Sequence, residues 1–402
     1  MNPTEKNVLK GIRVLDLGRY QAGPRCALMF ARLGAEVIKI ESLRGNESRT
    51  NGPIVNGQSA YWVQYNSGKK SLAIDLRQEQ GKTVLRDLIK VSDIFLQNFR
   101  TGTIEKMGFG YDALRQLNPR IIMINVSAYG QDGPYKDRIG FDPIGQALGG
   151  LMSLTGFPGT PPVKTYFPLI DRITALHATV GALAALYERN FSGEGQSIDV
   201  SLADTGFTTN EIPIAAYLSD GTIVEREGNG RGLTNAYRTT DGWALIHATS
   251  DSIWPRVCDA LGWKKWRDDP TLAKKNMRNQ KSQEIGTALE NWFAVRSTHD
   301  AVEHLSKFSV PAAPVNTVEQ AANDPHLHER EVLVEVPDPY AGSIHVTGKT
   351  IKFGRTPMEV GPAPTIGEHT EDILRDLLGY SDNLIEQLIK NAVIANQGPK
   401  PE

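Results

Sequence analysis

The first third of the chain alternates between strand patterns and helix patterns, and this alternation limits the possible folds more than any other feature. Apolar runs of strand length are separated by segments with helical periodicity. Strand patterns cover 11–17, 35–40, 72–75, 93–96 and 121–126, and helix patterns cover 24–33, 78–90 and 102–107. Strands that alternate with helices form parallel sheets with helices on both faces. We therefore predict an α/β fold whose large domain is a doubly wound, Rossmann-like sheet.

A long helix is predicted at 172–189, and a strand follows at 197–202. Gly193 and Gly195 end the helix pattern, and Asp171 stands directly before it. Alanine and glycine alternate with large apolar residues at helical spacing, which predicts a buried, tightly packed helix. The large apolar residues are Ile173, Leu176, Val180, Leu183 and Tyr187.

Asp171 allows two interpretations. The general one is an N-terminal cap, whose carboxylate accepts hydrogen bonds from backbone N–H groups of its own helix. The other is a nucleophilic carboxylate that attacks an activated carbonyl and forms a covalent acyl intermediate. In either case we expect the helix dipole and the free N–H groups to lower the pKa of this carboxyl group.

Beyond residue 204 the regular alternation stops. A helical connection leads to a turn at 219–221, and a strand pair with a turn at 240–242 is followed by helices near 252–261 and 280–295. Strands and helices without strict order predict a smaller α+β domain. The predicted boundaries are 1–203 for the large domain, 204–224 for a linker and 225–320 for the small domain.

The composition is that of an ordinary globular chain of 402 residues, with 40% hydrophobic residues and a net charge of -2. Acidic and basic residues are interspersed, so neither nucleic acid nor a membrane surface is an expected partner. No apolar run reaches the length that spans a membrane and the N-terminus lacks a signal-peptide pattern, so we expect a cytoplasmic protein. We expect Cys26 and Cys258 to be reduced core thiols, and no histidine spacing predicts a metal site.

Glu41 ends the second predicted strand, where dinucleotide-binding proteins carry the acid that binds ribose. The loop before the first helix argues against an NAD site. Residues 18–24 read Gly-Arg-Tyr-Gln-Ala-Gly-Pro, which is neither GxGxxG nor a Walker loop. In addition, Pro24 lacks the N–H group that a phosphate would bind.

Seven short segments, in this order and spacing, resemble the class III CoA-transferase family over nearly the whole chain. They cover 13–17, 21–24, 33–41, 97–99, 118–120, 129–134 and 192–196. The resemblance implies a CoA-transferase that takes coenzyme A and acyl-CoA as substrates and holds no permanent cofactor. It places the family's nucleophilic aspartate at Asp171 and a second active-site position at Gln21. The implied mechanism runs through an acyl-aspartyl anhydride and an aspartyl-CoA thioester.

The resemblance also implies the CoA contacts. They fall on Gln21, Ala22, Ile74, Asp75, Arg77, Asn98, Phe99, Arg100 and Lys106, with Arg138 as a looser candidate. One position departs from the family, because Ser42 stands where formyl-CoA transferases carry an arginine. Arg44 and Arg49 are the candidate substitutes.

Two alternatives stay open within the family. The racemase branch needs a base on each side of the α-carbon and carries a histidine in its Gly-His-Asp segment, whereas this chain has Gly140, Phe141 and Asp142. Phenylalanine cannot move a proton, which disfavours a racemase. The second alternative is the CoA-binding subunit of a heteromeric transferase.

The resemblance further implies an interlocked homodimer in which 321–402 returns to the large domain. It suggests succinyl-CoA as a donor, while the sequence itself does not identify the acids. It also places a glycine-rich lid, which closes over the acyl-enzyme, at Gly228, Gly230, Arg231 and Gly232.

Overall fold

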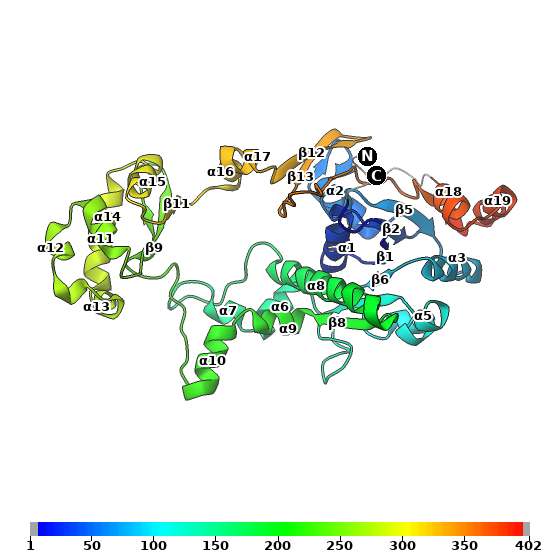
Figure 1. Cartoon of the computed structure of the whole chain (residues 1–402), viewed down its shortest axis with the longest axis horizontal. Coiled ribbons are helices and arrows are strands. Elements are labelled where there is room, and N and C mark those ends of the chain that lie inside the picture. Colours follow the sequence, from blue (N-terminus) through cyan, green and yellow to red (C-terminus); the bar gives the residue numbers. More distant parts are fainter. Residues whose placement is uncertain (1–6, 397–402) are drawn as a thin grey trace. The chain divides into compact units, whose positions relative to one another are not determined.

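The computed structural model describes residues 7–396 and is built around a seven-stranded sheet (Figure 1). Its order is β14 (Ile394–Ala395), β5 (Lys70–Ile74), β2 (Glu36–Glu41), β1 (Arg13–Asp16), β6 (Ile94–Gln97), β7 (Ile122–Ser127) and β8 (Ser197–Ser201). All neighbours are parallel except β14, which pairs antiparallel with β5. The predicted α/β fold with a parallel-dominated sheet is thus confirmed. The strand order runs outward in opposite directions from β1 and β6, which places a crevice beyond their carboxyl ends.

Successive side chains of each strand enter two separate cores, one on each face of the sheet. Leu15 and Ile38 belong to one core, and the neighbouring Val14 and Val37 belong to the other. The first core includes residues of α3 (Glu79–Lys90), α5 (Tyr111–Leu117) and α19 (Asp382–Lys390), and the second includes residues of α1 (Ala22–Arg32) and α8 (Leu169–Ser192). Strands that are covered on both faces explain the continuous apolar runs of the sequence.

Helix α8 buries most of its alanine residues and exposes several of its large apolar residues. Ala175 and Ala178 are fully buried in the core shared with α1 and the sheet. By contrast, Leu176, Val180 and Tyr187 are 46%, 64% and 68% exposed. The predicted close packing of the helix is thus found on its alanine side, which permits the closest approach to neighbouring backbones. The helix is not buried on all sides, however, because several of its large apolar residues are exposed.

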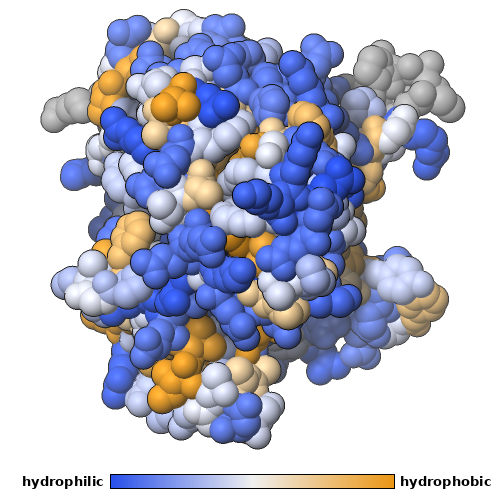
Figure 2. Space-filling model, turned by 90° about the vertical axis from the view of Figure 1, so that its left-hand side faces the viewer, coloured by the Kyte–Doolittle hydropathy of each residue, from blue (hydrophilic) through white to orange (hydrophobic). Residues whose placement is uncertain are grey.

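Of the helices in the described part of the chain, α8 alone is long and apolar enough to cross a membrane by length and composition. This differs from the expectation that no apolar run has that length. It is weak evidence for a membrane span, because the core helix of a soluble protein passes the same test. The face of the molecule in Figure 2 is mainly hydrophilic, with hydrophobic side chains in small groups.

The chain forms two compact units. The first comprises Met1–Met152, Lys164–Thr222 and His328–Glu402, and the second comprises Ser153–Val163 and Ile223–Leu327. The C-terminal segment joins the first unit through β14 and through a hairpin that packs on α2. These elements are β12 (Leu333–Asp338), β13 (Gly342–Thr347) and α2 (Ala60–Asn66). The segment predicted as a linker contains two helices, α9 (Leu202–Thr208) and α10 (Glu211–Asp220).

The second unit holds a three-stranded antiparallel sheet in the order β11-β10-β9. Its strands are β9 (Thr234–Arg238), β10 (Trp243–His247) and β11 (Ala312–Pro314). Its helices are α11 (Trp254–Leu261), α12 (Lys264–Arg267), η3 (Pro270–Leu272), α13 (Lys275–Gln280), α14 (Ser282–Ala294), α15 (Thr298–Lys307) and α16 (Val318–Ala322). Trp254 and Phe293 lie in its own hydrophobic core, so this unit has the content of the predicted α+β domain.

The remaining elements are short. They are η2 (Glu47–Thr50), β3 (Ile54–Val55), β4 (Gln58–Ser59), α4 (Thr103–Lys106), α6 (Asp142–Leu148), α7 (Leu151–Leu154), α17 (Pro325–Glu329), α18 (Thr370–Asp372) and η4 (Ile373–Leu377). The helical stretch near the C-terminus is interrupted, because Gly379 has a φ of 69° and separates η4 from α19.

Gly195, which precedes β8, lies so close to the neighbouring chain that no side chain fits. A Cβ atom there would lie 1.9 Å from the Ile121 carbonyl oxygen, and Gly195 N–H donates to the Pro119 carbonyl oxygen at 2.9 Å. We expect Gly195→Ala to lower the free energy of unfolding by about 2 kcal/mol or more, because backbone atoms must move. In the control, Gly354→Ala, the added Cβ meets nothing within 4 Å. Urea denaturation should show a change of less than ~0.5 kcal/mol for that control; equal effects of the two changes would contradict the packing argument.

Candidate active site

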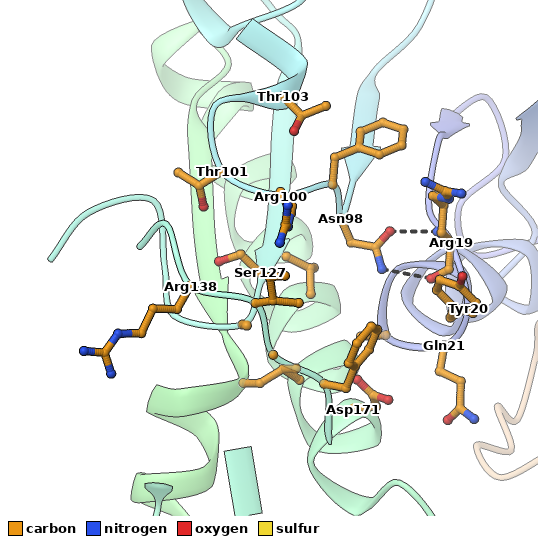
Figure 3. A pocket seen from close by; sticks show the side chains of 18 of the residues that line it. Arg19, Tyr20, Gln21, Asn98, Arg100, Thr101, Thr103, Ser127, Arg138 and Asp171 are labelled. Atoms are coloured by element: carbon orange, nitrogen blue, oxygen red, sulfur yellow. Dashed lines mark hydrogen bonds between the residues drawn. The ribbon is translucent and has the colours of Figure 1, made fainter. Parts of the chain in front are cut away.

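A cavity of about 430 Å³ lies in the first unit, at the crevice beyond β1 and β6 (Figure 3). Three loops and the first turn of α8 surround it, and these loops follow β1, β6 and β7. Its lining includes Arg19, Tyr20, Gln21, Ala22, Asn98, Phe99, Arg100, Ser127, Arg138, Phe141 and Asp171. The structure thus brings together Asp171 and six of the predicted CoA contacts.

Asp171 is the third residue of α8 and does not cap its own helix. The cap is supplied by Asp142, whose Oδ1 accepts hydrogen bonds from the N–H groups of Ile170 at 2.6 Å and Asp171 at 3.1 Å. Asp142 is buried, and its Oδ2 accepts a hydrogen bond from Gln146 Nε2 at 2.5 Å. The backbone donors that were expected to stabilise the Asp171 carboxylate are therefore occupied by another carboxylate. The side chain of Asp171 is therefore not used for helix capping and is free to react.

Burial and, second, the negative charge of Asp142 raise the pKa of Asp171 to about 7. The prediction of a lowered pKa is thus wrong, because it assumed that the helix N-terminus was free to act on Asp171. The group titrates in the neutral range, where a partly desolvated carboxylate is a better nucleophile than a fully hydrated one.

The loop after β1 is held by Asn98, the residue that follows β6. Asn98 Oδ1 accepts from the Arg19 N–H at 2.7 Å, and its Nδ2 donates to the Arg19 carbonyl oxygen at 2.9 Å (Figure 3). Tyr20 has a φ of 58°, and the chain then enters α1 at Gln21. Asn98, predicted as a CoA contact, therefore has a positioning role as well, since it fixes the backbone that presents Gln21.

A buried ion cluster that the sequence analysis missed supports the same loop. Lys69 Nζ donates to Asp16 Oδ2 at 2.7 Å and to the Pro24 carbonyl oxygen at 2.9 Å, and Lys39 Nζ donates to the Gly18 carbonyl oxygen. Burial acts to raise the pKa of Asp16, but the charges of Lys39 and Lys69 outweigh it and hold this pKa below its usual value. The signal in the sequence was a lysine in the middle of an otherwise apolar strand.

A second cavity, of about 1000 Å³, shares Arg19 and Phe99 with the first. Its lining includes the predicted CoA contacts Ile74, Asp75, Arg77, Phe99 and Lys106, and also Ser42 and Arg44. The predicted contacts are thus divided between two cavities with common walls. An elongated ligand with a reactive end and an anionic end fits such an arrangement.

Ser42 stands in place of the family's arginine, and Arg44 and Arg49 are the candidate substitutes. The two differ in whether the guanidinium is free to bind a phosphate. Arg44 is exposed and lines the second cavity. Arg49 is buried and donates to both carboxylate oxygens of Glu41, at 2.9 and 2.7 Å, while its guanidinium lies 3.6 Å from the ring centre of Trp62. Arg49 is therefore not free to bind a phosphate, and that alternative is wrong.

Arg138 and the glycine loop are the remaining predicted positions. The Arg138 guanidinium stacks on Tyr135 at 3.7 Å from the ring centre and points away from Asp171 (Figure 3). The loop residues Gly228, Gly230, Arg231 and Gly232 belong to the second unit, and the three glycines have φ values of 64°, 94° and 52°. These angles agree with the use of glycine there, while the lid itself stays a prediction.

Phe141 lies in the cavity wall at the position where the racemase branch carries a histidine. It is 61% exposed and contacts Tyr20 edge-on, with ring centres 6.3 Å apart. A phenylalanine ring supplies no proton acceptor, so the cavity lacks the second base that a racemase needs at this position.

Comparisons with known proteins identify the family of the chain. A model of the family described as "CoA-transferase family III" matches residues 9–370. The succinyl-CoA–D-citramalate CoA-transferase of Chloroflexus aurantiacus is 35% identical over 96% of this chain and 98% of its own length. The formyl-CoA:oxalate CoA-transferase of Bradyrhizobium diazoefficiens is 32% identical over 96% of this chain and 97% of its own.

Solved structures resemble the chain over nearly its whole length. A CAIB/BAIF family protein from Brucella suis has a TM-score of 0.82 and 30% identity, over 93% of this chain and 100% of that one. Rv3272 from Mycobacterium tuberculosis has a TM-score of 0.80 and 29% identity, over 90% and 98% of the two chains. The chain therefore belongs to CoA-transferase family III, and the protein is a CoA-transferase.

Proposed function

We propose that the protein moves CoA from an acyl-CoA donor to a free organic acid through covalent intermediates on Asp171. Succinyl-CoA is the donor that we propose, since the names of two relatives include it. One observation supports the mechanism. The Asp171 carboxyl group is half-buried, does not cap its own helix and lines the first cavity, which shares walls with a second cavity lined by cations.

The first half of the reaction transfers CoA to the enzyme. The Asp171 carboxylate attacks the thioester carbonyl carbon of the donor, the carbon–sulfur bond breaks, and CoA leaves as the thiolate while an acyl-aspartyl anhydride forms. The thiolate then attacks the Asp171 carbonyl carbon. The donor acid departs as its carboxylate, and Asp171 holds CoA as a thioester.

The second half repeats these steps with the acceptor. The acceptor carboxylate attacks the aspartyl thioester and expels the CoA thiolate, and the thiolate attacks the acceptor acyl carbon of the new anhydride. Acyl-CoA is released and the Asp171 carboxylate is restored, without net proton uptake. We assign the Gln21 amide as a hydrogen-bond donor to the tetrahedral oxyanion, because the N–H groups of Ile170 and Asp171 are engaged by Asp142.

The second cavity takes the nucleotide end of CoA in this proposal. Arg44, Arg77 and Lys106 contribute cations for its phosphates. Arg77 pairs with Asp75 at 2.8 Å, but its side chain is 90% exposed, so solvent screens this pair and the guanidinium can turn to a phosphate. The role of the glycine loop 228–232 as a lid stays a prediction, and the ratio of transfer to hydrolysis tests it.

We also propose that a second copy of the chain covers the apolar surface of α8 and α10, in an interlocked homodimer. Val180 and Tyr187 of α8 are 64% and 68% exposed, and Ile212 and Leu218 of α10 are both 75% exposed. Monomeric proteins rarely expose so many large apolar side chains. The alternative is a heteromer with a homologous partner chain. It is suggested by the succinyl-CoA–L-malate CoA-transferase of Chloroflexus aurantiacus, a relative that is named as a beta subunit.

Replacement of Asp171 tests the covalent mechanism. We expect Asp171→Asn and Asp171→Ala to lose at least ~1000-fold in kcat, because neither side chain forms the anhydride. Mass spectrometry of wild type with acyl-CoA should show an acyl or CoA adduct on the peptide that contains Asp171. Near-normal rates in the alanine variant, or an adduct on another residue, would refute the assignment.

The Asp171→Asn variant should be more stable than wild type at high pH. The folded-state pKa of Asp171 is about 7 and the ordinary value is 3.8, so ionisation opposes folding as the pH rises between these values. We expect Asp171→Asn to raise the free energy of unfolding by about 1–3 kcal/mol at pH 8, and by less at pH 5. A stability gain that does not depend on pH would contradict the raised pKa.

The pH dependence of kcat/KM tests the ionisation of the nucleophile. Because the carboxylate is the reactive form, kcat/KM should rise with pH through an apparent pKa near 7 and then level off. Asp142→Asn keeps an oxygen for the two N–H groups but removes a charge, so the midpoint should move to lower pH. Titration of the substrate is identical in both enzymes, and a midpoint that stays in place would contradict the coupling.

Sedimentation at nanomolar to micromolar concentration tests the assembly. Interlocked chains cannot separate without unfolding, so we expect a dimer at every dilution. Reversible monomer formation at micromolar concentration would contradict interlocking, and a requirement for a different chain would favour the heteromer.

A further inference from the structure

Tyr20 has a backbone conformation that is unusual for a large side chain. Its φ is 58°, in the left-handed region that glycine adopts without strain and aromatic residues rarely adopt. Such a conformation persists only where the surrounding structure enforces it, and it occurs most often at functional sites. Here Asn98 holds both the N–H group and the carbonyl oxygen of Arg19, directly before Tyr20. A glycine would fit this backbone with less strain, so the ring of Tyr20 needs an explanation.

The hydrophobic cores do not explain this ring. Tyr20 is 44% exposed and belongs to none of the cores within residues 7–396. Instead it lines the first cavity together with Asp171. Its ring contacts the ring of Phe141 edge-on, with the ring planes at 87°. Phe141 lines the same cavity and is also exposed, so two aromatic rings meet at the cavity wall and neither is fully covered by protein.

The backbone of Phe141 is fixed as well. Phe141 directly precedes α6, and its carbonyl oxygen accepts a hydrogen bond from the Ile144 N–H group at 2.8 Å. Gly140 lets this segment approach the end of β7, since a Cβ atom at position 140 would lie 2.8 Å from the Cβ atom of Ala128. The two rings thus come from two different loops, and hydrogen bonds fix the backbone beside each ring.

The aromatic pair, Tyr20 and Phe141, lies beside the groups that act in the proposed reaction. Tyr20 directly precedes Gln21, and Phe141 directly precedes Asp142. Asp142 in turn accepts a hydrogen bond from the Asp171 N–H group at 3.1 Å. Tyr20, Gln21 and Asp171 lie in the same part of the cavity (Figure 3). An acyl group on Asp171 therefore has the aromatic pair within its surroundings.

We propose that the aromatic pair binds the carbon chain of the acyl group that Asp171 carries. This inference rests on the proposed CoA transfer and adds a requirement for the substrate, which is a saturated carbon chain. A ligand gains about 4-fold in affinity for each methylene group that an apolar surface buries fully. Formyl and oxalyl groups contain no methylene group and gain nothing from the pair. No bond changes at the rings, which act by contact alone.

Thioether analogues of CoA test this contact without the reaction. S-methyl-CoA and S-butyl-CoA differ by three methylene groups, and neither has a thioester carbonyl that Asp171 could attack. In calorimetric titration we expect wild type to bind S-butyl-CoA about 10-fold or more tightly than S-methyl-CoA, because the longer chain covers part of the rings. Tyr20→Ala and Phe141→Ala should each reduce this ratio by about 3-fold or more. The affinity for S-methyl-CoA should change by less than about 2-fold in both variants, because its methyl group covers little of the rings.

Three further variants separate the ring from the hydroxyl group and from the backbone. Tyr20→Phe keeps the ring and should keep the wild-type ratio. Tyr20→Gly removes the ring and relieves the backbone, so it should lose the ratio as Tyr20→Ala does and melt about 1–2 °C above Tyr20→Ala. Tyr166→Ala removes an exposed ring that lines neither cavity and should leave the ratio unchanged.

Three results would overturn the proposal. They are a ratio near 1 in wild type, equal losses for the two analogues in Tyr20→Ala, and loss of the ratio in Tyr20→Phe. Equal losses would show that the ring only supports the fold. Equal melting temperatures of the glycine and alanine variants would overturn the argument from backbone strain that singles out Tyr20.

Exchange of CoA between succinyl-CoA and labelled acids distinguishes failure of the aromatic pair from failure of the proposed function. If wild type prefers S-butyl-CoA through the rings but exchanges CoA with no acid, the transfer proposal fails and the aromatic pair stands as a binding surface. If wild type exchanges CoA but the ratio of the two analogues ignores the rings, the aromatic pair fails alone.

Discussion

The site depends on the hydrogen bonds that two N–H groups in the first turn of α8 donate to Asp142. It sets the start of α8 at a fixed point beside the cavity, because Ile170 and Asp171 bond to a carboxylate from α6. It also determines the chemistry of Asp171. A free helix N-terminus would stabilise the Asp171 carboxylate and lower its pKa, whereas a terminus already neutralised by Asp142 leaves only burial and repulsion, which raise it.

The opposite wall of the cavity depends on a different kind of electrostatic support. Asp16, Lys39 and Lys69 are buried beneath the loop after β1, and the lysines reach the carbonyl oxygens of Gly18 and Pro24. Removing one member would leave unpaired charge in the core, so the cluster strongly favours one loop conformation. The carboxylate at 171 and the loop that carries Gln21 are thus each positioned by buried ionic groups that do not take part in the proposed chemistry.

The sequence predicted the parts of this protein that depend on local periodicity. Alternating strand and helix patterns were sufficient for the parallel sheet, because each strand is buried on both faces and reads as a continuous apolar run. The small residues of α8 indicated where neighbouring backbones approach closely, but local periodicity did not show that several large apolar residues of the helix stay exposed. Likewise, Asp171 was found through the family resemblance, whereas its cap comes from a residue far away in sequence and has no local signal.

Asp171 forms no salt bridge within residues 7–396, and two causes raise the pKa of its carboxyl group, burial first and the charge of Asp142 second. A direct salt bridge between Asp171 and a guanidinium group would lower this pKa, but it would also occupy the oxygen that must attack. The unpaired carboxyl group makes the free enzyme less stable, because a buried charge without a partner opposes folding. The same lack of a partner keeps the Asp171 carboxylate available for the proposed reaction.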